Sequence, residues 1–171
     1  MPSQDYEEFI AALNEREVRY LIVGAHALAL HARPRATKDL DILLDPTLAN
    51  ARRALAALRD FFGGADLGYT VEDLADPRWI IQLGVAPVRI DLMSAISGCP
   101  NFRAAWGRRA EARFGAVKTN YLGLDDLIRA KEAAGRAQDL ADVRVLRWAK
   151  AQQRTKTRSL RRTKKAASLK H

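Results

Sequence analysis

Cysteine is almost absent from the chain, because Cys99 is the only one among 171 residues. A single cysteine excludes an internal disulfide framework and suits a reducing compartment. The first eight residues also lack the basic and apolar regions of a signal peptide, and no uninterrupted apolar run is long enough to cross a bilayer. We therefore expect a cytoplasmic protein with no membrane partner.

Most of the chain has no net charge. Residues 1–149 contain 20 Lys and Arg against 20 Asp and Glu, whereas residues 150–171 contain nine basic residues and no acid. The formal net charge of +9 therefore belongs to the C-terminal end. Because its Lys, Arg, Ser and Thr composition cannot bury a core, we expect residues 154–171 to form a basic tail without structure.

The rest of the chain alternates between helical and strand periodicity. Apolar residues three and four apart predict helices, whereas short apolar or alternating runs predict strands. Helices are expected at residues 6–16, 25–32, 48–62, 102–109, 124–134 and 140–146, and strands at 20–23, 39–44, 79–83, 88–93 and 116–119. The strands at 79–83 and 88–93 are close enough to form a hairpin. The fold class is then α/β of the α+β type, a small mixed sheet with flanking helices and a C-terminal helical segment.

Two aspartates lie two residues apart on one predicted strand. Successive side chains on a strand point to opposite faces, so Asp39 and Asp41 project from the same face, roughly 6.5 Å apart along the chain. Their mutual repulsion is relieved if a cation sits between them, and magnesium takes oxygen ligands from carboxylates and phosphates. The alternative is that both aspartates belong to the solvated face of an antiparallel sheet.

Asp91 repeats this pattern on the second hairpin strand. Val88, Ile90 and Leu92 are expected to face the core, which leaves Asp91 on the opposite face. If that strand lies beside the one with Asp39 and Asp41, three carboxylates converge. Such a cluster suits two magnesium or manganese ions, one activating a hydroxyl and the other neutralising a leaving pyrophosphate.

Gly24 directly follows a predicted buried strand and opens a helix. Backbone N–H groups at Gly24, Ala25 and His26 are then directed at a phosphate by the helix terminus. The alternative is that a strand-to-helix turn needs a glycine for its backbone alone.

Three stretches of the sequence resemble motifs of the nucleotidyltransferase superfamily related to DNA polymerase beta. The resemblance is carried by residues 23–28, residues 34–42 and Arg89-Ile90-Asp91-Leu92. The C-terminal half, at residues 127–131, 134–136 and 139–143, resembles the branch of AbiEii-type and mycobacterial nucleotidyltransferase toxins. The implied organisation is a catalytic core at residues 1–98, a helical segment at 99–153 that completes the cleft, and the basic tail.

The resemblance also implies roles for individual residues. Gly24 and Ala25 contact a nucleoside triphosphate, and Asp39 and Asp41 hold two metal ions. Asp91 completes the catalytic site. The remaining expected nucleotide-binding residues are Arg35, Lys38, Lys131, Asp139 and Asp142.

Several of these residues also have structural interpretations. Arg35 and Lys38 contact phosphates or pair with the nearby carboxylates. Lys131 is a phosphate ligand or a solvent-facing helix residue, and Asp139 with Asp142 lines the cleft or caps the last helix. Ala25 stands where many relatives carry Ser or Gly, so a side-chain hydroxyl contact to phosphate is missing. Trp79, Trp106 and Trp148 are dispersed, and we expect them to pack in a core or interface.

The predicted function is metal-dependent transfer of a nucleoside monophosphate from a triphosphate to an acceptor hydroxyl. The acceptor is expected to be RNA, tRNA especially, or else a protein, and the tail is either an affinity arm for RNA or simply solvated. The resemblance adds a toxin role with an antitoxin partner. The alternative function is a catalytically impaired module that binds nucleic acid or a protein.

Overall fold

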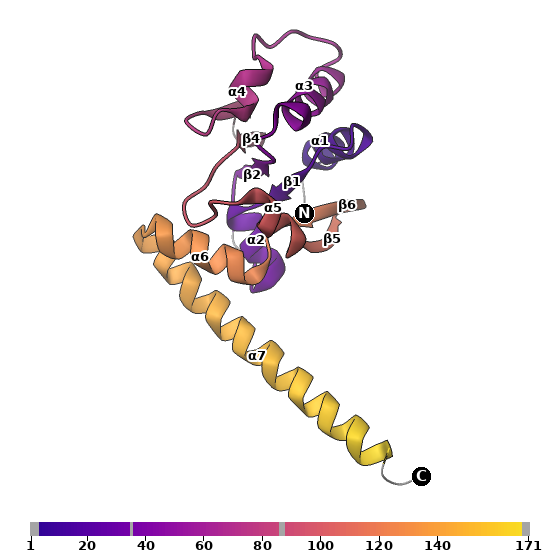
Figure 1. Ribbon diagram of the computed structural model, residues 1–171, viewed down its shortest axis with the longest axis vertical. Coiled ribbons are helices and arrows are strands. Elements are labelled where there is room, and N and C mark those ends of the chain that lie inside the picture. Colours follow the sequence, from indigo (N-terminus) through magenta and orange to yellow (C-terminus); the bar gives the residue numbers. More distant parts are fainter. Residues whose placement is uncertain (1–3, 35, 86–87, 169–171) are drawn as a thin grey trace.

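A six-stranded mixed sheet forms the centre of the protein, as seen in the computed structural model, which describes residues 4–34, 36–85 and 88–168 (Figure 1). The strand order is β3-β4-β2-β1-β6-β5. The helices are α1 (Gln4–Glu15), α2 (Gly24–His31), α3 (Leu48–Phe61), α4 (Val71–Ala75), α5 (Phe102–Gly107), α6 (Leu124–Ala134) and α7 (Ala137–Ser168). The strands are β1 (Tyr20–Ile22), β2 (Asp39–Leu44), β3 (Ile80–Val85), β4 (Val88–Met93), β5 (Ala110–Phe114) and β6 (Val117–Tyr121). The predicted α+β class is confirmed.

Strand β2 lies between two differently oriented neighbours. It pairs antiparallel with β1 and parallel with β4. The alternation of its sequence is reproduced in its burial, since Leu40 and Ile42 are fully buried whereas Asp39 and Asp41 are half-buried. The predicted hairpin is also present, because β3 and β4 pair antiparallel. Its connection at residues 86–87 lies outside the described residues.

Two polar side chains fix the ends of the strands that carry the aspartates. The Tyr6 hydroxyl on α1 lies 3.0 Å from the Lys38 carbonyl oxygen and 3.2 Å from that of Arg89, at the starts of β2 and β4. At the other end of β2, the fully buried Asn50 amide donates to the carbonyl oxygens of Arg19 and Asp45. Each contact holds β2 beside a neighbouring strand, so the relative position of the aspartates is determined well away from them.

Two short elements are present that the sequence patterns did not predict. One is α4, which is only five residues long but has a complete capping box between Thr70 and Asp73. The other is β5, which pairs antiparallel with β6. β5 is rich in Ala and Arg, which have little preference for strands, so its pairing with β6 rather than its composition determines its structure.

The prediction of an unstructured tail is wrong for residues 154–168. They continue α7 as one helix, which extends away from the rest of the protein (Figure 1). The segment from Ala137 to Ser168 contains no Gly or Pro and is rich in Ala, Gln, Lys and Arg, which are good helix formers. A core is therefore not required for helix formation here. Despite its length α7 is too polar to cross a bilayer, and none of the other helices described is long and apolar enough to do so.

Candidate active site

The register between β2 and β4 places two carboxylates side by side. Asp41 is the direct partner of Asp91, and Asp39 is the partner of Arg89. Because partners in register point to the same face of a sheet, all four side chains share one face. The expected proximity of the β4 carboxylate to the β2 pair is therefore present in the structure.

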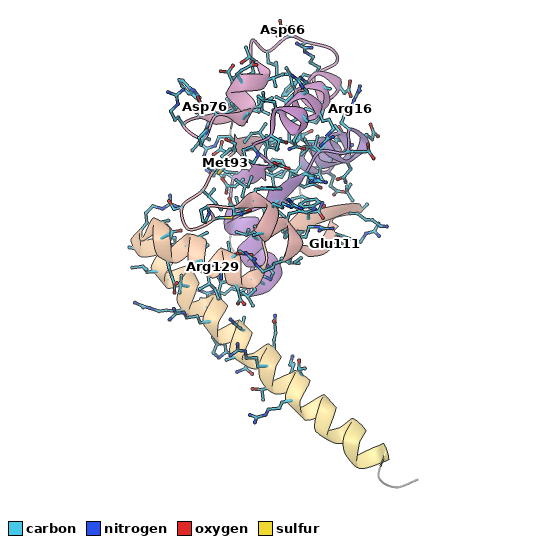
Figure 2. The ribbon with its side chains drawn as sticks, in the orientation of Figure 1. Arg16, Asp66, Asp76, Met93, Glu111 and Arg129 are labelled. Carbon is cyan, nitrogen blue, oxygen red and sulfur yellow. The ribbon has the colours of Figure 1, made fainter. Side chains whose placement is uncertain are left out.

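Asp41 and Asp91 line a cavity of about 510 Å³ between the sheet and α6. The wall on the side of the sheet includes Gly24 and Met93. Met93 is the last residue of β4 and is labelled in Figure 2. The opposite wall is made by α6, the start of α7 and the turn between them, and its charged residues are Lys131, Arg136 and Asp139. The cavity thus has two carboxylates on one wall and two cationic side chains on the other.

Gly24 allows Asp41 to lie where it does. Its backbone has a φ of 62°, in the left-handed region that favours glycine. A Cβ atom at this position would lie 2.1 Å from Asp41 Oδ2 and 2.9 Å from its Cγ. The turn that opens α2 therefore packs directly against the carboxylate, and a side chain at residue 24 would displace it.

The charge of Asp41 is poorly compensated in the folded chain. Burial raises the pKa of the Asp41 carboxyl, and the nearby charges of Asp91 and Asp39 raise it further against the opposing effect of Arg89. A divalent cation between Asp41 and Asp91 would relieve both effects. The two carboxylates and the open cavity beside them therefore fit magnesium, which takes one or two carboxylates together with substrate phosphates.

Asp39 has a different environment from Asp41. Arg89 Nη2 donates to Asp39 Oδ2 at 2.6 Å, whereas Arg89 Nε lies 3.5 Å from Asp91 Oδ1 without a hydrogen bond. Within the described parts of the chain, no group of three His, Cys, Asp or Glu side chains is arranged to hold a metal ion. The Arg89 side chain is 34% exposed, so it lies at the rim and does not seal the cleft.

Lys131 is a buried residue of the cavity wall. Its Nζ atom lies 2.8 Å from Asp142 Oδ2 and 3.3 Å from Asp139 Oδ1, and all three side chains are at most 8% exposed. Burial by itself raises the pKa of Asp139, but hydrogen bonds from Arg136 and Lys131 outweigh it and hold the pKa below its usual value. The interpretation of Lys131 as a solvent-facing residue is therefore wrong. Asp139 and Asp142 lie in the first turns of α7 and join it to α6 through this lysine.

The other predicted nucleotide-binding residues are placed less centrally. Ala25 is buried on α2, behind Gly24, and does not line the cavity. Lys38 is exposed and lines a separate hollow with Asp39 and Arg89. Arg35 lies outside the described residues. Trp79 and Trp148 are 59% and 66% exposed, so they do not pack in the core, and their packing at an interface stays a prediction.

Two polar residues of the site were missed by the sequence patterns. Arg136 follows the left-handed Gly135 that ends α6, and its largely exposed side chain pairs with Asp139 at 2.6 Å. Gln82 on β3 donates to Asp91 Oδ1 at 3.3 Å. An Arg directly after a helix-ending Gly was the available signal for the first, whereas the second depends on the hairpin register.

Substitution of Lys131 by Met should destabilise the fold by about 3–5 kcal/mol, because it leaves two buried carboxylates without their shared cation. The measurement is the free energy of unfolding in urea. Lys118→Met on β6, where the side chain is exposed, is the matched control and should change stability little. A loss no larger than that of the control would show that the buried cluster does not hold α6 to α7.

Substitution of Asp41 by Asn should stabilise the chain at neutral pH in the absence of divalent metal. The raised pKa means that ionisation of Asp41 costs folding free energy, so this cost is absent at low pH and present above the pKa of the folded state. The gain over wild type should therefore shrink as pH falls through that pKa toward the ordinary value of 3.8. Thermal unfolding across this range tests it, and a variant less stable than wild type at neutral pH would contradict it.

A comparison with protein-family models identifies a match over residues 4–151, to a family described as a nucleotidyltransferase of unknown function, DUF6036. The matched region contains every strand of the sheet, together with Asp41, Asp91 and the buried group of Lys131, Asp139 and Asp142. No curated protein matches the chain. Since the match covers most of the chain and the cavity combines carboxylates with a glycine turn, the chain belongs to this nucleotidyltransferase family.

Proposed function

We propose that the protein transfers a nucleoside monophosphate from a nucleoside triphosphate to a hydroxyl group of an acceptor, in a reaction that depends on divalent metal. The observation that supports it best is the register pair Asp41 and Asp91 beside Gly24 at an open cavity. In this reaction the acceptor oxygen forms a bond to the α-phosphorus while the bond from that phosphorus to the bridging oxygen breaks. Pyrophosphate leaves with that oxygen, and the proton of the acceptor hydroxyl would pass to a carboxylate of the site, for which Asp91 is the candidate.

Each wall of the cavity has a distinct role in this proposal. Asp41 and Asp91 would hold magnesium or manganese, and Asp39 would join them on releasing Arg89. Two such ions, when bound, activate the attacking hydroxyl and neutralise the leaving pyrophosphate. The backbone N–H groups at the start of α2, together with Arg136, would bind the phosphates from the other side.

Lys131 takes a modified role because of its two acidic partners. With Asp139 and Asp142 within 3.3 Å, it is not a free cation directed at a phosphate. Its first role would be to position Asp139 and the adjacent Arg136 at the cavity. Contact of Lys131 with the triphosphate remains part of the proposal, since its side chain lines the cavity.

RNA, with tRNA foremost, is the acceptor that we propose, and a protein hydroxyl is the second choice. The nine basic residues of the C-terminal end support a polyanionic acceptor. The motif resemblance at residues 127–131, 134–136 and 139–143 supports a cytoplasmic toxin with an antitoxin partner. Growth arrest on expression of the wild-type chain, relieved by Asp41→Asn, would test that role.

The second candidate is a nucleotidyltransferase fold that binds nucleic acid or a protein without catalysis. The ion pair of Asp39 with Arg89 favours it, because it leaves two carboxylates rather than three for metal. The absence of a hydroxyl at Ala25 points the same way. RNA binding without metal-dependent nucleotide binding would favour this candidate over the enzyme.

The transfer reaction is tested with each labelled triphosphate, magnesium and total tRNA or cell lysate. The wild-type chain should label a macromolecule, and Asp91→Asn should lower the rate by at least about 10²-fold because it removes a metal ligand. Asp60→Asn is the matched control, since Asp60 is exposed on α3 and pairs with Arg16, and neither residue lines the cavity. Equal labelling by the wild type and Asp91→Asn would refute the proposal.

Substitution of Gly24 by Ala should lower the transfer rate about 100-fold, since displacement of a catalytic group by about 1 Å has an effect of that size. Gly64→Ala is a matched control, because its φ of 87° is also left-handed but no atom lies within 4 Å of the new Cβ. Both variants should lose some stability from backbone strain. Only Gly24→Ala should lose activity in the folded protein, and comparable activity of both variants would show that the packing of Gly24 on Asp41 is dispensable.

A further inference from the structure

A second cavity lies between the start of α6 and the middle of α7. It has a volume of about 580 Å³ and is distinct from the site of Asp41 and Asp91. Its charged lining residues are Arg108, Asp125, Asp126, Lys150, Arg154 and Arg158. Helix α6 connects the two cavities, because its first turn borders this groove while Lys131 borders the other one, about 10 Å farther along the helix axis.

The charges of this groove are only partly compensated. Arg108 makes two hydrogen bonds to the buried Asp126, at 2.9 and 2.8 Å, and Lys150 lies 2.6 Å from Asp125. Arg154 and Arg158 have no carboxylate within ion-pair distance among the residues that the structure describes. Four cationic side chains therefore share the groove with two carboxylates, and the acids hold the first two cations in place.

The basic residues of α7 follow the helical repeat. Lys150, Arg154 and Arg158 are spaced by four residues, which places them on one face of the helix. The stripe from Lys150 to Arg158 is about 12 Å long at 1.5 Å per residue. It begins in the groove and follows α7 away from the rest of the protein (Figure 1).

We propose that this groove and stripe bind the sugar-phosphate backbone of a single nucleic-acid strand, without sequence preference. A line of cations with unpaired arginines matches a chain of evenly spaced phosphates. Among the residues that line the groove, Leu124 is the only large apolar one. The groove therefore lacks the aromatic and apolar anchors of a protein interface. Residues 150–168 contain only Leu160 as a large apolar residue, which leaves no apolar face for insertion into a membrane surface.

This binding surface goes beyond the transfer reaction and does not depend on it. A strand in the groove is held by charges outside the catalytic cavity, whether or not it is the acceptor. Binding is therefore measured without triphosphate or divalent metal. Asp41→Asn should bind the strand as the wild type does, so loss of catalysis and loss of strand binding can be told apart.

The experiment measures fluorescence anisotropy of labelled single-stranded RNA and DNA oligonucleotides over a series of salt concentrations. The double variant R154Q/R158Q should bind about tenfold more weakly at low salt. The slope of the logarithm of the binding constant against that of salt should fall in magnitude by about 1.4, because each lost phosphate contact on a single strand contributes about 0.7. RNA and DNA should respond alike, since the contacts are to phosphates.

Two control variants test whether the loss of binding is specific to the groove. R52Q/R59Q removes the same charge from exposed positions on α3, which lies at the far end of the molecule from α7 (Figure 1). K156Q removes an exposed charge from a different face of α7, about 160° around the helix axis from Arg154. Circular dichroism checks that α7 remains helical in each variant.

The proposal requires both controls to bind nearly as the wild type does. It is overturned if R154Q/R158Q binds as tightly as the wild type, or if either control loses as much affinity. It is also overturned if vesicles containing anionic lipid, or a poly-glutamate peptide, displace the oligonucleotide at equal charge concentration. These outcomes would assign the stripe to non-specific charge, a membrane surface or an acidic protein.

Discussion

The parallel pairing of β2 with β4 is the constraint on which the candidate site depends. A shift of one residue in this pairing would turn Asp91, or Asp39 and Asp41 together, toward the core, since side chains alternate faces along a strand. In the observed register Asp41 meets Asp91 and Asp39 meets Arg89. Tyr6 at one end of β2 and Asn50 at the other support this register from outside the site.

The resulting site carries a local cost in stability. Asp41 packs against Gly24, partly buried and beside like charges. The pKa of its carboxyl is raised, so ionisation of Asp41 costs folding free energy. On the opposite wall, the buried Lys131 is matched by two carboxylates and joins α6 to α7. Among the residues described on the first wall, only Arg89, at the rim, offsets the carboxylates, whereas the second wall is internally compensated. This asymmetry suits the joint binding of a metal and an anionic substrate.

Helix α7 extends this organisation away from the cavity. Its first turns complete the wall with Asp139, and its middle forms the basic groove with Arg154 and Arg158. A single element therefore belongs to both cavities. In the family to which this chain belongs the function is not known, and this arrangement relates the catalytic candidate to a surface suited to a long anionic partner.

The features that followed from sequence were those determined by local periodicity. Alternation across residues 39–44 predicted the acidic face of β2, and apolar spacing predicted a helix at residues 124–134, which are the bounds of α6. The interaction of Arg89 with Asp39 was not predicted, because it depends on the register between strands. The environment of Lys131 depends on how α6 packs on α7, which no spacing within one helix reveals.

The error at the C-terminal end has a different cause. Composition indicated correctly that residues 154–158 bury no core, since they are exposed. It did not follow that the segment lacks structure, because a run of good helix formers without Gly or Pro continues a helix that is already nucleated and anchored at Leu146 and Ala149. Extending an existing helix by one residue costs much less free energy than nucleating a new helix.

The central claim is that Asp41 and Asp91 bind cations jointly beside the Gly24 turn. It is tested most directly by a crystal structure with manganese and a non-hydrolysable nucleoside triphosphate, with the metal located by anomalous scattering. The account predicts manganese in contact with both carboxylates and with phosphate oxygens at the start of α2. Manganese and triphosphate bound elsewhere, with the Asp41 and Asp91 carboxylates free of metal, would contradict it.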